Sequence, residues 1–254
     1  MKKILVAGMV AGMAVGANAQ LALNLIDSSI NTSSVNVNGT LGAGEYAATY
    51  SNGGGAGFGG VLGGGRIGMD ADASNMYFGF SPNGGLGSNV AVIYLDTKAG
   101  GFTTATMTDT SDGGRSATSK LGKDGAEVFP AGFQADYAVF FGGFGAVALE
   151  LTSGTHNFLV FNNSGSDKEI SISRATLGLT GSSIGFNWFA AYCSDTMFNS
   201  NESMPASALN GAGNPGFTGG ATYNRWNRFE AVPEPGTMAA LGLGVAAMLR
   251  RRKK

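Results

Sequence analysis

Short β-rich runs separated by turn residues recur along the sequence, and they limit the fold more than any other feature. The candidate strands cover residues 45–50, 76–80, 90–95, 102–108, 134–141, 144–151, 156–161, 169–173, 183–192 and 222–232. Val147, Leu149 and Leu151 share one face of such a strand. The alternation breaks at Arg174, where we expect a bulge or a short helical turn. Because no long helical period occurs outside the two ends, we predict an all-β, antiparallel β-sandwich of jelly-roll type.

The first residues have the composition of a secretory signal peptide. A basic start at 1–3 is followed by an apolar stretch at 4–15, and Ala17 and Ala19 give a small-x-small pattern before Gln20. The apolar part is too short to span a membrane, and no stop-transfer pattern follows it. We therefore predict a signal helix that signal peptidase removes after Ala19.

The last residues combine three parts in a fixed order. Pro233, Glu234 and Pro235 come first, and an apolar run at 237–249 follows. The chain then ends in the cations Arg250, Arg251, Arg252, Lys253 and Lys254. A helix over the apolar run would be about 20 Å long, which is short against a hydrocarbon core of about 30 Å. The basic end favours the cytoplasmic side of a membrane.

This ordered tail resembles the PEP-CTERM sorting signal, which bacteria that make exopolysaccharide place on exported proteins. The resemblance implies an exosortase-type processing enzyme as partner, a transient stay in the membrane through a short C-terminal hydrophobic helix, and a final place at the cell surface or in the extracellular matrix. An ordinary C-terminal membrane anchor is the alternative. The predicted organisation is a signal peptide at 1–19, a β-sandwich body at 20–231 and the sorting signal at 232–254.

The charge of the body excludes one class of partner. The chain has 16 basic and 17 acidic residues, of which seven basic residues and Glu234 lie in the two ends. The body keeps nine basic and 16 acidic residues, a net charge of −7. Since nucleic-acid binding needs clustered Lys or Arg to neutralise phosphates, we expect no nucleic-acid partner.

Glycine and cysteine usage add two expectations. Glycines concentrate near 51–65, which we interpret as a flexible loop. No strand-then-helix context surrounds that loop, so a phosphate-binding role has little support. Cys193 is the single cysteine, which excludes an intramolecular disulfide, and we expect a buried, inert thiol there.

Part of the body resembles a known group of exported proteins. The segments 72–80, 90–97 and 185–192, with the later 200–205 and 213–216, resemble strands and loops of sugar-binding sandwiches of the DOMON and family-9 carbohydrate-binding type. The similarity lies in pattern rather than identity. It supports the fold and carries over no ligand residue.

Candidate catalytic residues are few. His156 is the only histidine, no nucleophile-elbow motif is present, and a structural role is expected for it. A zinc site from one His and one distant Cys is not expected. Glycosidases need two carboxylates about 5 to 10 Å apart. Glu127, Asp136 and Glu150 are candidates for such a pair, although nothing in the sequence pairs them.

A calcium site is not expected either. The segment 70–74 begins like a calcium loop, with oxygen ligands at alternate positions. The glycine of the sixth position is replaced by Asn75 and the glutamate of the twelfth by Ser81. We therefore predict an ordinary turn there, with no metal and no cofactor, and leave open a calcium ion bound differently elsewhere.

One aromatic residue is a candidate for sugar contact. If 222–232 forms a strand, Trp226 shares a face with Asn224 and Arg228. An indole among polar side chains would stack on a sugar ring while its neighbours bind hydroxyls. The alternative is that Trp226 covers one end of the core.

Three classes of function remain open. The first is a non-catalytic surface or matrix protein with a structural, adhesive or polysaccharide-binding sandwich, as in biofilms. The second is a secreted glycoside hydrolase or another polysaccharide-active enzyme with a carboxylate pair. The third is an exported scaffold without a ligand. We expect the first, because a sorting tail is present and catalytic motifs are missing.

Overall fold

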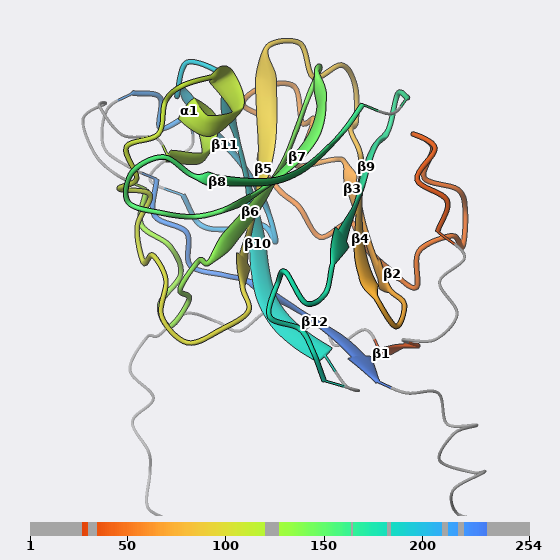
Figure 1. The fold of residues 1–254 in the computed structure, drawn as a ribbon. Helices are drawn as coiled ribbons and strands as arrows, with labels where there is room; N and C mark the ends of the chain where they lie inside the picture. Colours follow the sequence, from red (N-terminus) through yellow and green to blue (C-terminus); the bar gives the residue numbers. More distant parts are fainter. Residues whose placement is uncertain are drawn as a thin grey trace, which may run out of the picture.

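The computed structural model describes residues 27–29, 35–119, 127–163, 165–181, 184–209, 213–217 and 221–232. Within these residues, two β-sheets pack face to face as an open sandwich, and all named strand pairs except β1 with β12 are antiparallel (Figure 1). The predicted all-β sandwich is therefore confirmed. The signal peptide and the sorting tail, with the helices predicted for them, lie outside the described residues.

The large sheet has eight strands and the small sheet four among the described residues. The large sheet contains β1 (Asp27–Ser29), β12 (Asn227–Val232), β10 (Ile184–Ser194), β5 (Asn89–Asp96), β6 (Tyr137–Gly142), β7 (Gly145–Glu150) and β8 (Asn157–Asn162) in this order, and β11 (Asn199–Met204) pairs with β10. The small sheet contains β2 (Ala48–Tyr50), β3 (Arg66–Ala71), β4 (Asn75–Ser81) and β9 (Lys168–Ser173). A short helix, α1 (Gly113–Ser119), lies outside the sandwich.

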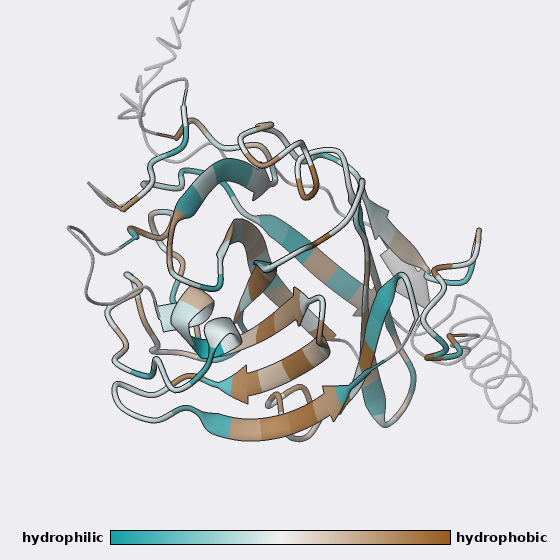
Figure 2. Ribbon diagram, turned by 90° about the horizontal axis from the view of Figure 1, so that it is seen from above, coloured by the Kyte–Doolittle hydropathy of each residue, from teal (hydrophilic) through white to brown (hydrophobic). Residues whose placement is uncertain are grey.

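Both faces of the large sheet are buried over much of their area. The inner face packs on the small sheet, where Trp188 meets Tyr50 edge to face with ring centroids 4.7 Å apart. The outer face carries a second apolar cluster, which includes Tyr94 and Phe189 and which α1 and the connecting loops cover. Figure 2 shows α1 beside the hydrophobic strands of this sheet. Double-sided burial explains why central strands such as β6 are apolar throughout.

The alternation within β7 matches this two-sided core. Val147, Leu149 and Leu151 belong to the outer cluster, and Ala146 and Ala148 belong to the inner one. The prediction that Val147, Leu149 and Leu151 share one face is confirmed. In β7 the two faces thus differ in side-chain size, and its small residues point toward the small sheet.

The break in alternation at Arg174 is also confirmed. Strand β9 ends at Ser173, and a turn occupies 174–178. The buried Arg174 guanidinium donates to backbone carbonyls on both sides, among them those of Leu179 and Asp72. The cation therefore holds the β3–β4 turn against the turn that follows β9.

Several expectations were wrong in detail. The run 102–108 forms only isolated bridges at Phe102 and Thr104, because this segment crosses the outer face as a loop instead of joining a sheet. Strands β1, β3 and β11 and helix α1 were not predicted. Among the described residues, no helix is both long and apolar enough to cross a membrane.

The glycine-rich loop near 51–65, which was predicted to be flexible, has little regular structure and is packed onto the sandwich. Val61 and Leu62 in it are buried. The loop wraps around the buried carboxylate of Glu202 in β11, which accepts backbone hydrogen bonds from Phe58, Gly60, Leu62 and Gly63. Glycine is needed here because the backbone approaches closely; a Cβ at Gly55 would lie 2.3 Å from the carbonyl oxygen of Asn201.

Candidate functional site

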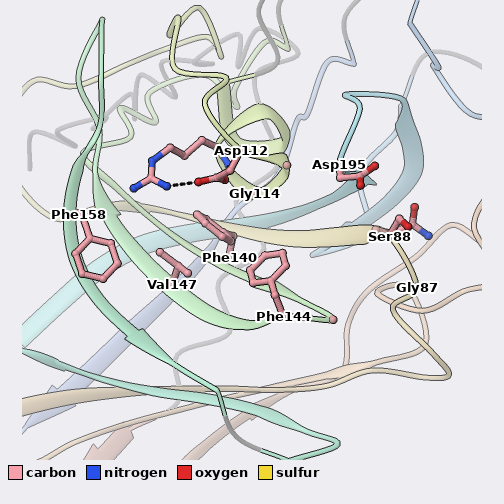
Figure 3. Close-up of a pocket in the computed structure, with 13 residues that line it drawn as sticks. Gly87, Ser88, Asp112, Gly114, Phe140, Phe144, Val147, Phe158 and Asp195 are labelled. Atoms are coloured by element: carbon pink, nitrogen blue, oxygen red, sulfur yellow. Dashed lines mark hydrogen bonds and ion pairs between the residues drawn. The ribbon is translucent and has the colours of Figure 1, made fainter.

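A cavity of about 490 Å³ opens on the outer face of the large sheet, at the end where β5 and β7 begin and β6 and β10 finish (Figure 3). Its lining comes from five separate parts of the described chain. These residues are Gly87, Ser88, Asn89, Asp112, Gly113, Gly114, Arg115, Phe140, Gly143, Phe144, Val147, Phe158 and Asp195.

Aromatic side chains form the floor of this pocket. Phe140 and Val147 are buried partners in the β6–β7 ladder. Phe144, at the tip of the hairpin between these strands, is 44% exposed, and Phe158 on β8 is 56% exposed. The Phe144 ring meets Phe140 edge to face with centroids 5.7 Å apart. An exposed apolar patch inside a hollow is typical of a binding site.

Two glycines allow these parts to come together. A Cβ at Gly142 would lie 2.3 Å from a ring atom of Phe144, so only glycine lets that ring fold back over the hairpin. A Cβ at Gly114 would lie 2.2 Å from the ring of Phe140. Helix α1 therefore rests directly on the sheet, and its first turn forms one wall of the pocket.

The polar rim is built around the start of α1. Asp112 caps the helix, since its Oδ1 accepts from the backbone N–H of Arg115 at 2.8 Å. The Arg115 guanidinium contacts the carboxylates of Asp112 and Asp109, the latter at 3.3 Å. Asp195, half-buried and packed beside Gly113 at the start of α1, makes no ion pair or side-chain hydrogen bond within the described part of the chain. The rim is thus net acidic.

Asp109 supports the rim from behind. Burial alone raises the pKa of its carboxyl, but hydrogen bonds from Ser111 and from the backbone N–H of His156 outweigh this effect and hold the pKa below its ordinary value. The ionised Asp109 then fixes Arg115, and Arg115 is left with little capacity to bind an anionic ligand.

His156 lies beneath this region with Ser119, in an arrangement that differs from a catalytic triad. Its Nδ1 accepts from the backbone N–H of Thr152 at 3.3 Å, so the proton is on Nε2, which donates to Ser119 Oγ at 2.9 Å. In a triad, Nε2 accepts the serine proton and Nδ1–H donates to the acid. Asp109 instead accepts from the backbone of His156. The geometry is that of a structural histidine.

The three carboxylates singled out from the sequence do not line the pocket. Glu127 is buried and accepts from Tyr223 Oη at 3.0 Å. Asp136 accepts from the backbone N–H groups that follow β5, and Glu150 pairs with Lys98 at 3.2 Å. The pocket carboxylates Asp112 and Asp195 were missed. For Asp112 the sequence offers one local signal, since aspartate is a common residue just before a helix. For Asp195 it offers none.

The predicted sugar contact at Trp226 lies elsewhere on the outer face. Strand β12 begins at Asn227, so Trp226 precedes it and packs partly buried against the outer apolar cluster. Asn224 Oδ1 accepts from the backbone N–H of Ala208, and Arg228 contacts Glu230. None of the three residues lines the pocket. A role for Trp226, Asn224 and Arg228 in sugar binding stays a prediction.

The segment 70–74 ends strand β3 and forms the β3–β4 turn at 72–74, so the predicted turn is present. Asp72 Oδ1 accepts from the backbone N–H groups of Ser74 and Asn75, and its Oδ2 accepts from Tyr77 Oη. Burial raises the pKa of Asp72, but these hydrogen bonds outweigh it and hold the pKa below its ordinary value. The carboxylate therefore serves the turn itself. Within the described residues, no cluster of three His, Cys, Asp or Glu side chains is placed to hold a metal ion.

Comparison with known proteins identifies a sorting motif in the last residues of the chain. A family model described as the PEP-CTERM protein-sorting motif matches residues 231–253. No curated protein and no solved structure matches the chain. The protein therefore carries the sorting signal that its tail resembles, and it is exported and sorted through an exosortase-type enzyme to the cell surface or the extracellular matrix.

Proposed function

We propose that the protein is a non-catalytic component of the bacterial surface or exopolysaccharide matrix, and that its β-sandwich contacts polysaccharide through the pocket beside α1. The sorting motif supports the destination. The pocket supports the activity, because it offers aromatic ring faces in a hollow with a few polar groups at the rim.

One observation carries the proposal: Phe144 and Phe158 are among the most exposed large apolar side chains of the described chain, and both line the same cavity. Leaving two phenyl rings in water has no benefit for folding. Aromatic faces pack well on the apolar face of a sugar ring, while rim groups such as Ser88 and Asp195 accept hydrogen bonds from hydroxyls.

The position of the pocket agrees with this role. Strand β12 reaches Val232 beside the start of β10, where Ala231 pairs with Ile184. The pocket lies where β10 finishes, next to Asp195. Strand β12, the last described element before the sorting tail, therefore ends at the side of the sandwich opposite the pocket, as the places of β12 and α1 in Figure 1 show. A protein that is held at the membrane by its tail would present the pocket on the side away from the membrane.

Co-sedimentation with the producing cell's own exopolysaccharide tests the proposal. We expect Phe144→Ala and Phe158→Ala to weaken retention about five- to tenfold, as loss of a stacking ring does. Phe161→Ala is the matched control, since Phe161 lies on the same strand, is 48% exposed and does not line the cavity. Wild-type retention by both pocket variants, with loss in Trp226→Ala, would move the site to Trp226.

A secreted glycoside hydrolase is the second candidate, because Asp112 and Asp195 line one cavity. Asp112 is already committed to the α1 cap and to Arg115, which favours the binding role. Incubation with exopolysaccharide and an assay for reducing ends decides between the two. Release of reducing sugar that disappears in Asp195→Asn would establish the hydrolase, and absence of release is expected for the binding protein.

A further inference from the structure

We propose that the pocket selects a cationic polysaccharide, one that contains hexosamine units with free amino groups. This inference rests on the proposed function, that the pocket holds polysaccharide, and it adds the chemical class. It follows from the charges at the rim, from the aromatic floor and from the charge of the whole body.

Among the described lining residues, the rim has a carboxylate without an ion-pair partner and no cationic side chain without one. The lining contains two carboxylates, those of Asp112 and Asp195, and one guanidinium, that of Arg115. Arg115 is already shared between Asp112 and Asp109, and its side chain is 19% exposed. A uronate or sulfate group would meet two carboxylates with no available partner. An ammonium group would pair with Asp195, which has no ion pair within the described chain.

The floor suits a cation as well as a sugar ring. Ammonium groups are attracted to the faces of aromatic rings within about 6 Å, and such contacts strengthen when water is excluded. Phe144 and Phe158 expose their rings in the same hollow as Asp195. A hexosamine unit offers both an apolar ring face and an amine. A neutral hexose uses the rings alone and leaves the carboxylate without a charged partner.

The charge of the body acts in the same direction at longer range. The predicted body, with nine basic and 16 acidic residues, has a net charge of −7. It repels polyanions and attracts polycations over about one Debye length, which is about 8 to 10 Å at physiological salt. Selectivity should therefore decline as salt is added, whereas stacking on the rings should persist.

The test is calorimetric titration of protein released from the cell surface, at mildly acidic pH where sugar amines are protonated. Four probes are compared: a glucosamine oligomer, the N-acetylglucosamine oligomer of equal length, a uronic-acid oligomer and oligolysine. We expect the glucosamine oligomer to bind at least about fivefold more tightly than its acetylated counterpart, as one partly exposed charge pair predicts. The uronic-acid oligomer should bind more weakly still. Oligolysine, which has no sugar ring to stack on the phenyl rings, should bind more weakly than the glucosamine oligomer.

Two variants separate this inference from the proposed function. Asp195→Asn should bring the two hexosamine oligomers to equal affinity, and Phe158→Ala should weaken both. Equal wild-type binding of the acetylated and free oligomers would overturn the cationic selectivity and leave the pocket as a sugar site. Binding of no saccharide would overturn the proposed function too. Preference for oligolysine would replace the polysaccharide with a basic protein partner.

Discussion

At the scale of single residues, two buried glutamates organise loops that have no regular structure of their own. Glu202 accepts four backbone hydrogen bonds from the glycine-rich loop, at 2.8 to 3.1 Å. Glu169 does the same for 38–40 and also accepts from Tyr46 Oη at 2.8 Å. Charge-assisted hydrogen bonds of this kind offset the cost of burying a carboxylate.

Glu202→Gln should lower the free energy of unfolding by about 2 to 4 kcal/mol. The amide nitrogen of glutamine is a donor, so two of the four loop N–H groups would lose their acceptor. Urea denaturation measures the change. Glu230→Gln is the control, because Glu230 is partly exposed and a surface pair contributes at most about 1 kcal/mol. Equal effects of the two variants would contradict the role of Glu202.

The single histidine gives a pH test. Burial lowers the pKa of His156. The unfolded chain therefore takes up the proton first as pH falls, and the contribution of His156 to stability is full above about pH 6.5 and declines as pH falls below it. The stability of wild type relative to His156→Asn should be constant above neutrality and decrease toward pH 5. Denaturant titrations across this range check it; an increase at low pH would contradict it.

At the scale of elements, the small sheet depends on one ring laid over two paired glycines. Gly68 and Gly79 face each other in the β3–β4 ladder, and the Tyr46 ring covers both. A Cβ at Gly79 would lie 2.7 Å from Tyr46 Oη, and a Cβ at Gly68 would lie 2.6 Å from the ring. The ring replaces the side chains that these glycines lack, as in other sheets with aromatic cover of glycine.

Gly79→Ala should therefore destabilise the protein by about 1 to 3 kcal/mol through overpacking against Tyr46. Gly85→Ala is the matched control, because no atom lies within 4 Å of its Cβ position, and a change within about 0.5 kcal/mol is expected. Thermal unfolding of both variants gives the comparison. A neutral Gly79→Ala would mean that Tyr46 is free to move away.

The sequence predicted those elements whose pattern is local. Alternation in β7 and the long apolar run of β10 were sufficient, and Trp188, Phe186 and Tyr192 of β10 lie in the inner core. Strand β11 is mostly polar, and its burial depends on loop contacts about 140 positions away. Strand β3 is buried at nearly every position, and it contains Gly68 and Asp70, so it shows neither alternation nor a clear apolar run.

At the scale of the whole molecule, the destination of the protein can be predicted from the sequence, whereas the position of its pocket cannot. The sorting signal is contiguous, so its residues are readable from the sequence alone. The pocket combines the segment before β5, α1, the β6–β7 hairpin, β8 and the turn after β10, and only the sheet order brings these parts together. No spacing along the chain indicated that Asp195 and Phe158 share a cavity.

The opposite positions of the pocket and of the end of β12 give a test on cells. Ser88 is exposed at the pocket, and Thr180 is exposed near the start of β10. A thiol introduced by Ser88→Cys should react with a bulky maleimide on intact cells faster than one introduced by Thr180→Cys. Both should react alike in the released protein, where the buried Cys193 contributes no background. Faster reaction at position 180 on cells would show that the pocket faces the cell, which would contradict the proposed orientation.

Protection of that same thiol by polysaccharide tests the central claim most directly. Released Ser88→Cys and Thr180→Cys proteins are alkylated with and without the cell's own exopolysaccharide, and the two rates are compared. We predict that the polysaccharide slows alkylation at position 88 several-fold and leaves position 180 unchanged. An unchanged rate at position 88 while the protein is retained on the polysaccharide would show that the pocket beside α1 is not where the ligand binds.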